Sequence, residues 1–117
     1  MNGSNPKDEL QQLQADYLDD LGEKLKLMSE HAEALATRAR FRTSFPVLLF
    51  LTHQIKGSGG SLGFPHVSEI AKKMSSELNS FLEADDPPKP AELARSVGSL
   101  NAELERALLV AREQIKA

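Results

Sequence analysis

The chain of 117 residues contains no cysteine and no tryptophan, with only one tyrosine and five phenylalanines. The absence of cysteine excludes disulfides, thiol catalysis and cysteine-ligated zinc. The shortage of aromatic residues favours a core of leucine, alanine and methionine on helices over a sheet. Hydrophobic residues make up 40% and charged residues 26% of the chain, which is typical of a globular domain.

Long hydrophobic runs and a surplus of basic charge are also missing. No apolar stretch approaches the roughly 20 residues that span a bilayer, and Met1 to Leu10 is too polar for a signal peptide. The formal net charge is −3, with both signs interspersed, which argues against nucleic acid as the main partner. We therefore expect a cytoplasmic, monomeric protein that contacts neither membrane nor nucleic acid.

Apolar residues recur at helical spacing in four segments, and no strand candidate competes with them. The first segment runs from Lys7 to Arg38, after a lead-in over residues 1–6 that we expect to be disordered. Gly22 costs about 1 kcal/mol relative to alanine, so a bend or break would fall there. The apolar stripe of this segment consists of Leu10, Leu13, Tyr17, Leu21, Met28 and Leu35.

The second helix is predicted to begin at a cap formed by Thr43 or Ser44, with Pro46 in its first turn. It should continue toward Leu62, where Gly63 provides the stop.

Two more helices follow. Pro65 opens the third, and residues 85–90, Asp-Asp-Pro-Pro-Lys-Pro, form the clearest loop before the fourth. Four amphipathic helices with mostly short connections predict an all-α fold, an antiparallel up-down four-helix bundle with one domain over residues 7–117. The stripes of the last two helices are Val67, Ile70, Met74, Leu78 and Phe81, and Leu93, Val97, Leu100, Leu104, Leu108, Ala111 and Ile115.

A histidine lies on the polar side of the second helix. On a helical wheel His53 falls about 160° from the core-facing stripe, so its imidazole should point to solvent. The stripe consists of Leu48, Leu51, Ile55 and Leu62, and the positions three, four or seven residues from His53 are Leu49, Phe50, Lys56, Gly57 and Gly60.

The glycines beside His53 oppose helix formation. Gly57, Gly59 and Gly60 together cost about 2–3 kcal/mol of helix propensity. The compensating benefit would be steric, because another protein can then approach the imidazole closely. Leu49 and Phe50 would offer this partner an apolar shoulder.

This constellation suits phosphoryl transfer. Neutral imidazole is a good nucleophile near neutral pH without a partner base. The negative charge of a phosphohistidine would lie one turn from the Lys56 ammonium, which can neutralise part of it. Ser58 or Ser61 could add a hydroxyl bond, although both lie toward the side of the helix.

Several alternatives remain at this level. A single exposed histidine is usually an ordinary surface residue, and residues 57–63 could be a flexible loop that ends the helix. A phosphate-binding P-loop is poorly supported, because no strand precedes these glycines and no Gly-Lys-Ser/Thr sequence follows them. The dinucleotide-binding motif fails because Leu62 occupies the position of its third glycine. Metal binding is poorly supported because His31, His53 and His66 lack ligand spacing. We assign His31 to a polar face and His66 to the first turn of the third helix.

The residues around His53 resemble the signature of histidine-containing phosphotransfer (HPt) domains, the intermediate carriers of multistep phosphorelays. The likeness extends through the third helix to about Phe81, while the first and fourth helices match only by pattern. The matching residues are His53-x-x-Lys56-Gly57-Ser58-x-x-x-Leu62-Gly63.

The resemblance implies a four-helix bundle with His53 as phosphoacceptor, Lys56 as charge partner and Gly57 as the position that gives access. The family often has serine or alanine in the position after Ser58, where this chain has Gly59, which is a mild departure. Ser75 replaces a Gln or Glu that the family often places near the histidine.

The sequence therefore predicts a phosphoryl carrier, with no enzymatic activity of its own. Its partner would be the receiver domain of a response regulator, and a hybrid sensor histidine kinase is a further candidate. We expect no cofactor and no metal in this chain, since the receiver would supply the metal. An interaction module without chemistry is the main alternative, and an enzyme is a distant third.

Overall fold

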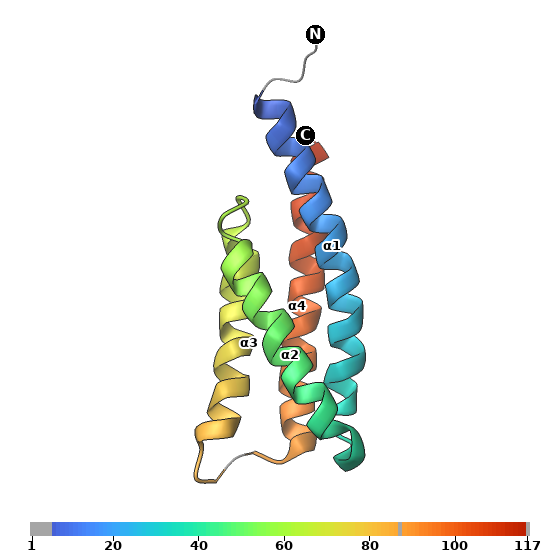
Figure 1. Cartoon of the computed structure of the whole chain (residues 1–117), viewed down its shortest axis with the longest axis vertical. Coiled ribbons are helices and arrows are strands. Elements are labelled where there is room, and N and C mark those ends of the chain that lie inside the picture. The colour runs from blue at the N-terminus through green and yellow to red at the C-terminus, as the bar shows by residue number, and fades with distance from the viewer. Residues whose placement is uncertain (1–5, 87, 117) are drawn as a thin grey trace.

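The computed structural model describes residues 6–86 and 88–116 and consists of four helices that run alternately up and down (Figure 1). They are α1 (Pro6–Ala34), α2 (Arg38–Ser58), α3 (Pro65–Glu83) and α4 (Pro90–Lys116). α1 packs against α2 and α4, and α3 packs against the same two helices. The predicted all-α antiparallel bundle is confirmed.

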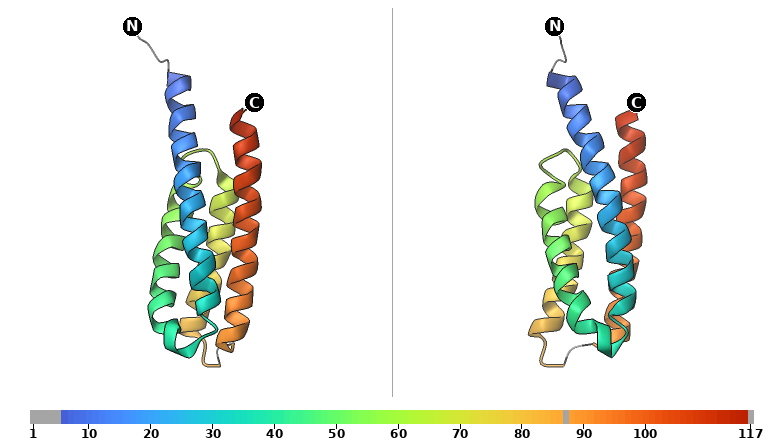
Figure 2. Two further views of the ribbon diagram at one scale, coloured as in Figure 1. Left: turned by 90° about the vertical axis from the view of Figure 1, so that its right-hand side faces the viewer. Right: turned by 45° about the vertical axis from the view of Figure 1, so that its right-hand side comes forward.

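The bundle is long and narrow, with extents of 60 × 22 × 20 Å. α1 and α4 project beyond the turn that joins α2 to α3, as two views from other sides show (Figure 2). Leu10 and Leu13, predicted as part of the apolar stripe, are therefore exposed, at 47% and 57%. Further along α1 the stripe is right, because Leu21 and Met28 are buried. Residues 1–5 of the expected lead-in lie outside the described residues, and Pro6 is already helical.

The connection between α1 and α2 lies earlier in the chain than predicted. α1 ends at Ala34 instead of Arg38, and α2 begins at Arg38 instead of after Thr43 or Ser44. Thr37 has the extended backbone of a cap position, although its side chain forms no capping bond. The predicted Thr43 or Ser44 cap is wrong.

An aromatic cluster explains the early start of α2. The rings of Phe41 and Phe45 lie 5.3 Å apart, and Phe81 of α3 lies 5.3 Å and 5.8 Å from them. Pro46 therefore falls inside the helix instead of in its first turn. It removes one backbone bond, and the aromatic contacts hold the preceding two turns in place.

α1 shows no break at Gly22. An added Cβ there would lie 3.2 Å from Arg112 Nη2 and 3.6 Å from Leu108 Cδ2. The glycine thus allows close packing against α4 within one continuous helix.

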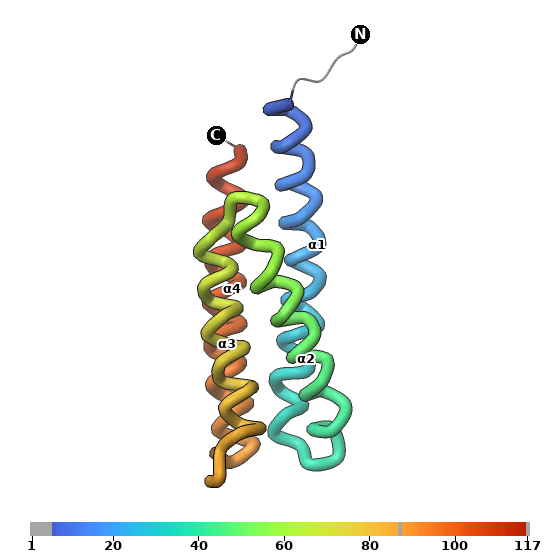
Figure 3. Tube along the Cα trace, turned by 60° about the vertical axis from the view of Figure 1, so that its left-hand side comes forward, coloured from blue at the N-terminus to red at the C-terminus, as the bar shows by residue number. Residues whose placement is uncertain are grey.

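The turn from α2 to α3 begins earlier than predicted. α2 ends at Ser58 rather than near Leu62, and Figure 3 shows the tight turn that follows. Gly63 is the stop residue of this turn, with φ 92°. Such a backbone favours glycine because a Cβ is strained there. α3 then opens at Pro65, as predicted.

α2, α3 and α4 contribute their predicted stripes to the core, beside the buried residues of α1. Leu100, Ile115 and Phe81 are half-buried at its edge. The buried members are Leu48, Leu51, Ile55, Val67, Ile70, Met74, Leu78, Leu93, Val97, Leu104, Leu108 and Ala111.

Candidate functional site

His53 lies on the outward side of α2. Its side chain is exposed, whereas the preceding Thr52 is fully buried and donates its hydroxyl hydrogen bond to Met74 Sδ at 3.3 Å. The change from buried to exposed within one residue fixes the side of the helix on which the imidazole lies. Leu62, assigned to the core stripe, instead lies half-buried in the turn.

The surface beside His53 is open where the sequence predicted it to be. A Cβ added at Gly57 or Gly60 would meet no heavy atom within 4 Å. Phe50 is 60% exposed, while Leu49 is half-buried and packs against the core. An approaching surface would therefore meet the Phe50 ring before the Leu49 side chain.

The backbone of Lys56 forms a hydrogen bond with α3, whereas its side-chain ammonium has no ion-pair partner in the described part of the chain. Its carbonyl oxygen accepts a hydrogen bond from the Ser68 hydroxyl of α3. In residues 6–86 and 88–116, no carboxylate lies within ion-pair distance of its ammonium. The ammonium group is therefore free to interact with a negative charge from another molecule, and it lies one turn from His53.

Ser58 is used for packing within the chain. Its hydroxyl lies 2.7 Å from the carbonyl oxygen of Gln54 and 3.0 Å from the Tyr17 hydroxyl. The Tyr17 ring stacks on Phe64 with centroids 5.9 Å apart. Burial raises the pKa of Tyr17, an effect that the hydrogen bond with Ser58 partly offsets. Ser61, the other candidate hydroxyl, is exposed.

α1 braces the turn that follows α2. Gln14 donates a hydrogen bond from Nε2 to the carbonyl oxygen of Leu62 at 2.8 Å. Together with the contacts of Tyr17, this bond ties the projecting part of α1 to the end of the helix that carries His53. Sequence reasoning assigned Tyr17 to the core stripe and missed Gln14, which lies on the same side of α1.

Gly59 is enclosed, unlike its neighbours. A Cβ there would lie 3.0 Å from the backbone nitrogen of Ser68 and 3.2 Å from the carbonyl oxygen of Phe64. The Gly59 amide also caps α2 by bonding to the carbonyl oxygen of Ile55 at 3.0 Å. The packing at this position therefore disfavours a residue larger than glycine. This contact depends on residues after the turn and is not visible in the sequence pattern.

Ser75 is half-buried on α3 and is oriented by Asn79. The Asn79 amide donates to the Ser75 hydroxyl at 3.2 Å and to the Ser75 carbonyl at 2.9 Å. Because the hydroxyl oxygen accepts a bond from Asn79, its own proton can be donated elsewhere. Sequence reasoning missed Asn79.

The other two histidines occupy different surroundings. His31 is half-buried, and its Nδ1 lies 2.9 Å from the hydroxyl of buried Ser44, a contact that the assignment to a polar face did not include. His66 is exposed in the first turn of α3, 3.8 Å from a Glu69 oxygen. Within the described ranges, no three His, Asp or Glu side chains come together as a metal site.

Three grooves of the molecule lie away from His53. One of about 890 Å³ lies where α2 and α4 begin, one of about 730 Å³ lies between α1 and α4, and one of about 690 Å³ lies between α3 and α4. None of the three is lined by His53, whose side chain is exposed on α2.

As far as the structure describes them, none of the helices combines the length and apolar character that a bilayer crossing requires.

Comparison with known proteins identifies the family. The chain matches no curated protein and no solved structure. The family model for the Hpt domain matches residues 8–113, nearly the whole chain. Hpt domains carry phosphoryl groups in phosphorelays and are not kinases. The chain belongs to the Hpt domain family.

Proposed function

We propose that this protein carries a phosphoryl group on His53 between the receiver-domain aspartates of a multistep phosphorelay. The observation that supports this role best is the exposure of His53 beside the open positions Gly57 and Gly60 and the unpaired Lys56. A receiver domain needs this access because its aspartate must approach within bonding distance of the imidazole. The first phosphoryl donor is a receiver or a hybrid sensor kinase.

The transfer needs little from this chain beyond a positioned nucleophile. One ring nitrogen of neutral His53 attacks the phosphorus of the aspartyl phosphate, while the proton remains on the other nitrogen. The N–P bond forms as the O–P bond breaks, and the aspartate carboxylate leaves. The reverse reaction passes the phosphoryl group to a second receiver. The receiver supplies the metal ion, and Lys56 neutralises part of the charge on the phosphohistidine.

Phosphate labelling distinguishes this function from an interaction module without chemistry. The protein is incubated with a panel of phosphorylated receivers, and the label is tested for the acid lability and base stability of phosphohistidine. His53→Gln should abolish labelling, whereas His31→Gln and His66→Gln should retain it. Because His53 is exposed, its replacement should change the free energy of unfolding by no more than about 0.5 kcal/mol.

Two results would overturn the proposal. One is normal labelling of the His53→Gln protein. The other is receiver binding by the wild-type protein with no phosphate incorporation, which would favour the interaction module. The cytoplasmic location expected from the sequence remains part of the proposal.

A further inference from the structure

The helix that carries His53 differs in charge from the rest of the molecule. α2 holds four cations, Arg38, Arg40, Arg42 and Lys56, and no carboxylate. The neighbouring α1 holds eight carboxylates and three lysines, and the whole chain has a net charge of −3. Of the four described helices, the one that carries the proposed phosphoacceptor is therefore the only one with a net positive charge.

Two of the arginines lie on the side of α2 that carries His53. Arg42 is about 20° from His53 around the helix and about 16 Å from it along the axis. Arg38 is about 60° from His53, whereas Arg40 points about 140° away from it. All three arginines are exposed.

Arg38 and Arg42 also line a groove of about 890 Å³ at the end of the bundle where α2 and α4 begin. Lys89 adds a third cation to this groove, and Phe41 and Phe81 provide apolar lining. We call Arg38, Arg42 and Lys89 the basic face.

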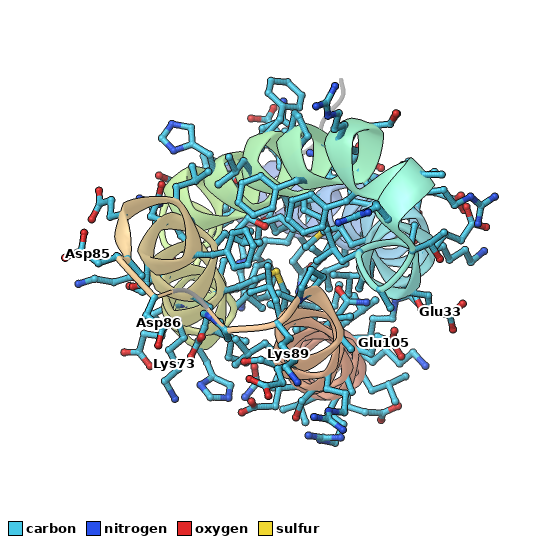
Figure 4. The ribbon with its side chains drawn as sticks, turned by 90° about the horizontal axis from the view of Figure 1, so that it is seen from below. Glu33, Lys73, Asp85, Asp86, Lys89 and Glu105 are labelled. Carbon is cyan, nitrogen blue, oxygen red and sulfur yellow. The ribbon has the colours of Figure 1, made fainter. Side chains whose placement is uncertain are left out.

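The charges of the basic face are not neutralised within the described part of the chain. No carboxylate of residues 6–86 and 88–116 lies within ion-pair distance of them. Viewed from this end, Lys89 lies near the start of α4, and the acidic Asp85 and Asp86 lie on the α3 side of the loop (Figure 4).

The local backbone adds to this positive potential. α2 begins without a side-chain cap and without an acidic residue in its first turn. Arginines at a helix N-terminus are unfavourable because the helix dipole is positive there. An acidic surface placed against this end would relieve that repulsion.

We propose that the basic face is a second contact region for the phosphorelay partner, and that it selects receivers with surplus carboxylates on the surface beside the phosphorylated aspartate. This inference rests on the proposed phosphocarrier function. A standard interface covers about 800 Å² on each partner, a disc of roughly 16 Å radius. A receiver centred on His53 therefore reaches Arg42 and the adjoining edge of the groove.

Charges at the rim of an interface act mainly on association. They steer the encounter and orient the partner, and salt weakens their effect. The basic face should therefore raise the second-order rate constant of transfer and leave the rate within the assembled complex unchanged. Receivers with a basic or neutral surface at the corresponding place should gain nothing.

The test uses the full chain and the receiver of the panel that exchanges phosphate with it fastest. The Arg38→Gln/Arg42→Gln double variant and the Arg42→Gln single variant are compared with Arg40→Gln. Arg40→Gln removes a charge at the same end of the helix but on the other side. At about 0.02 M salt the double variant should lower the second-order rate constant roughly three- to tenfold, and at about 0.5 M salt the difference should nearly vanish. Arg40→Gln should have less than half the effect of Arg42→Gln alone.

Each outcome is decisive. An equal loss in Arg40→Gln and Arg42→Gln would mean that only net charge matters and would overturn the basic face. Unchanged rates in the double variant would overturn it too, while normal transfer by the wild type would leave the phosphocarrier function intact. If the wild-type protein exchanged phosphate with no receiver, both proposals would fall together.

Discussion

The two kinds of glycine around the end of α2 differ in their surroundings. Gly57 and Gly60 have nothing within 4 Å of an added Cβ, and they lie on the outward side with His53. Gly59 has backbone atoms at 3.0 Å and 3.2 Å, and Gly63 combines a φ of 92° with a side-chain atom at 3.1 Å. One residue type therefore occurs in two settings here: the open glycines leave the surface beside His53 clear, and the closed glycines allow this chain to pack against itself.

The open glycines are not required by the fold. Gly57 lies within α2, where alanine or leucine would be favoured by about 1 kcal/mol. The closed glycines have no such alternative, because a side chain would collide or be strained. Substitutions at the two kinds should therefore separate phosphotransfer from stability.

Among substitutions that keep His53, the largest effect is expected for Gly57→Leu. Residue 57 is one turn from His53, so the leucine side chain would stand beside the imidazole. Displacing a receiver by about 1 Å costs on the order of 100-fold in transfer rate. Stability should be unchanged or higher by up to about 1 kcal/mol. Rapid-quench transfer assays and urea unfolding measure the two quantities.

A small reagent that modifies histidine provides the control for Gly57→Leu. It should still react with His53 in the variant, because only a protein-sized partner is blocked. Transfer at the wild-type rate would show that the space at Gly57 is unused. Unfolding of the variant would show that this glycine supports the backbone instead.

The opposite pattern is expected at a closed glycine. Gly59→Ala places a Cβ against backbone atoms of Ser68 and Phe64, which yield less easily than a side chain. We expect a loss of about 1–3 kcal/mol in stability. The transfer rate per folded molecule should change little. Gly60→Ala is the matched control, and its stability should stay within about 0.5 kcal/mol of the wild type. Equal destabilisation by both changes would remove the distinction between the two kinds of glycine.

The contrast between the glycines marks the limit of what the sequence predicts. Helical spacing is a local property, so it gave four helices and the outward side of His53. It could not separate Gly57 from Gly59, because that difference depends on Ser68 of α3 and on Phe64 just before it. The start of α2 was missed for a related reason. Contacts of Phe41 and Phe45 with Phe81 stabilise helical turns ahead of the predicted cap at Thr43 or Ser44.

A smaller effect is expected at the charge beside the open glycines. Lys56→Ala removes an unpaired ammonium while the backbone bond from Ser68 to residue 56 remains. An exposed charge pair contributes about 0.2–1 kcal/mol, so phosphohistidine lifetime or transfer rate should fall by up to about fivefold. Lys56→Arg should retain most of the effect. If Lys56→Ala behaved as wild type at both low and high salt, the ammonium would be only a solvated charge.

The smallest effect concerns the brace of α1 against the closed glycines. Tyr17→Phe keeps the stacking on Phe64 and removes the hydroxyl that bonds with Ser58. Since this contact is only part-buried, we expect a loss of about 0.5 kcal/mol, the low end for a hydrogen bond. Urea unfolding near neutral pH measures it.

The same tyrosine provides a titration that tests the brace directly. Burial raises the pKa of Tyr17 above its usual 10.0, opposed by the bond with Ser58 and by Lys24. The neutral phenol therefore favours the folded state below pH 10, and this contribution is lost as pH rises through the raised pKa. Tyr17→Phe should lack that alkaline loss of stability.

The titration reports one group, because Tyr17 is the only tyrosine in the chain. Phenolate absorbance of the folded protein should give a midpoint above 10.0, the ordinary pKa. Ser58→Ala should move the midpoint further upward, because it removes a hydroxyl that stabilises the phenolate. A midpoint at or below the ordinary value in the wild-type protein would mean that the ring is solvated. The projecting part of α1 would then not brace the turn, and the closed glycines would depend on α3 alone.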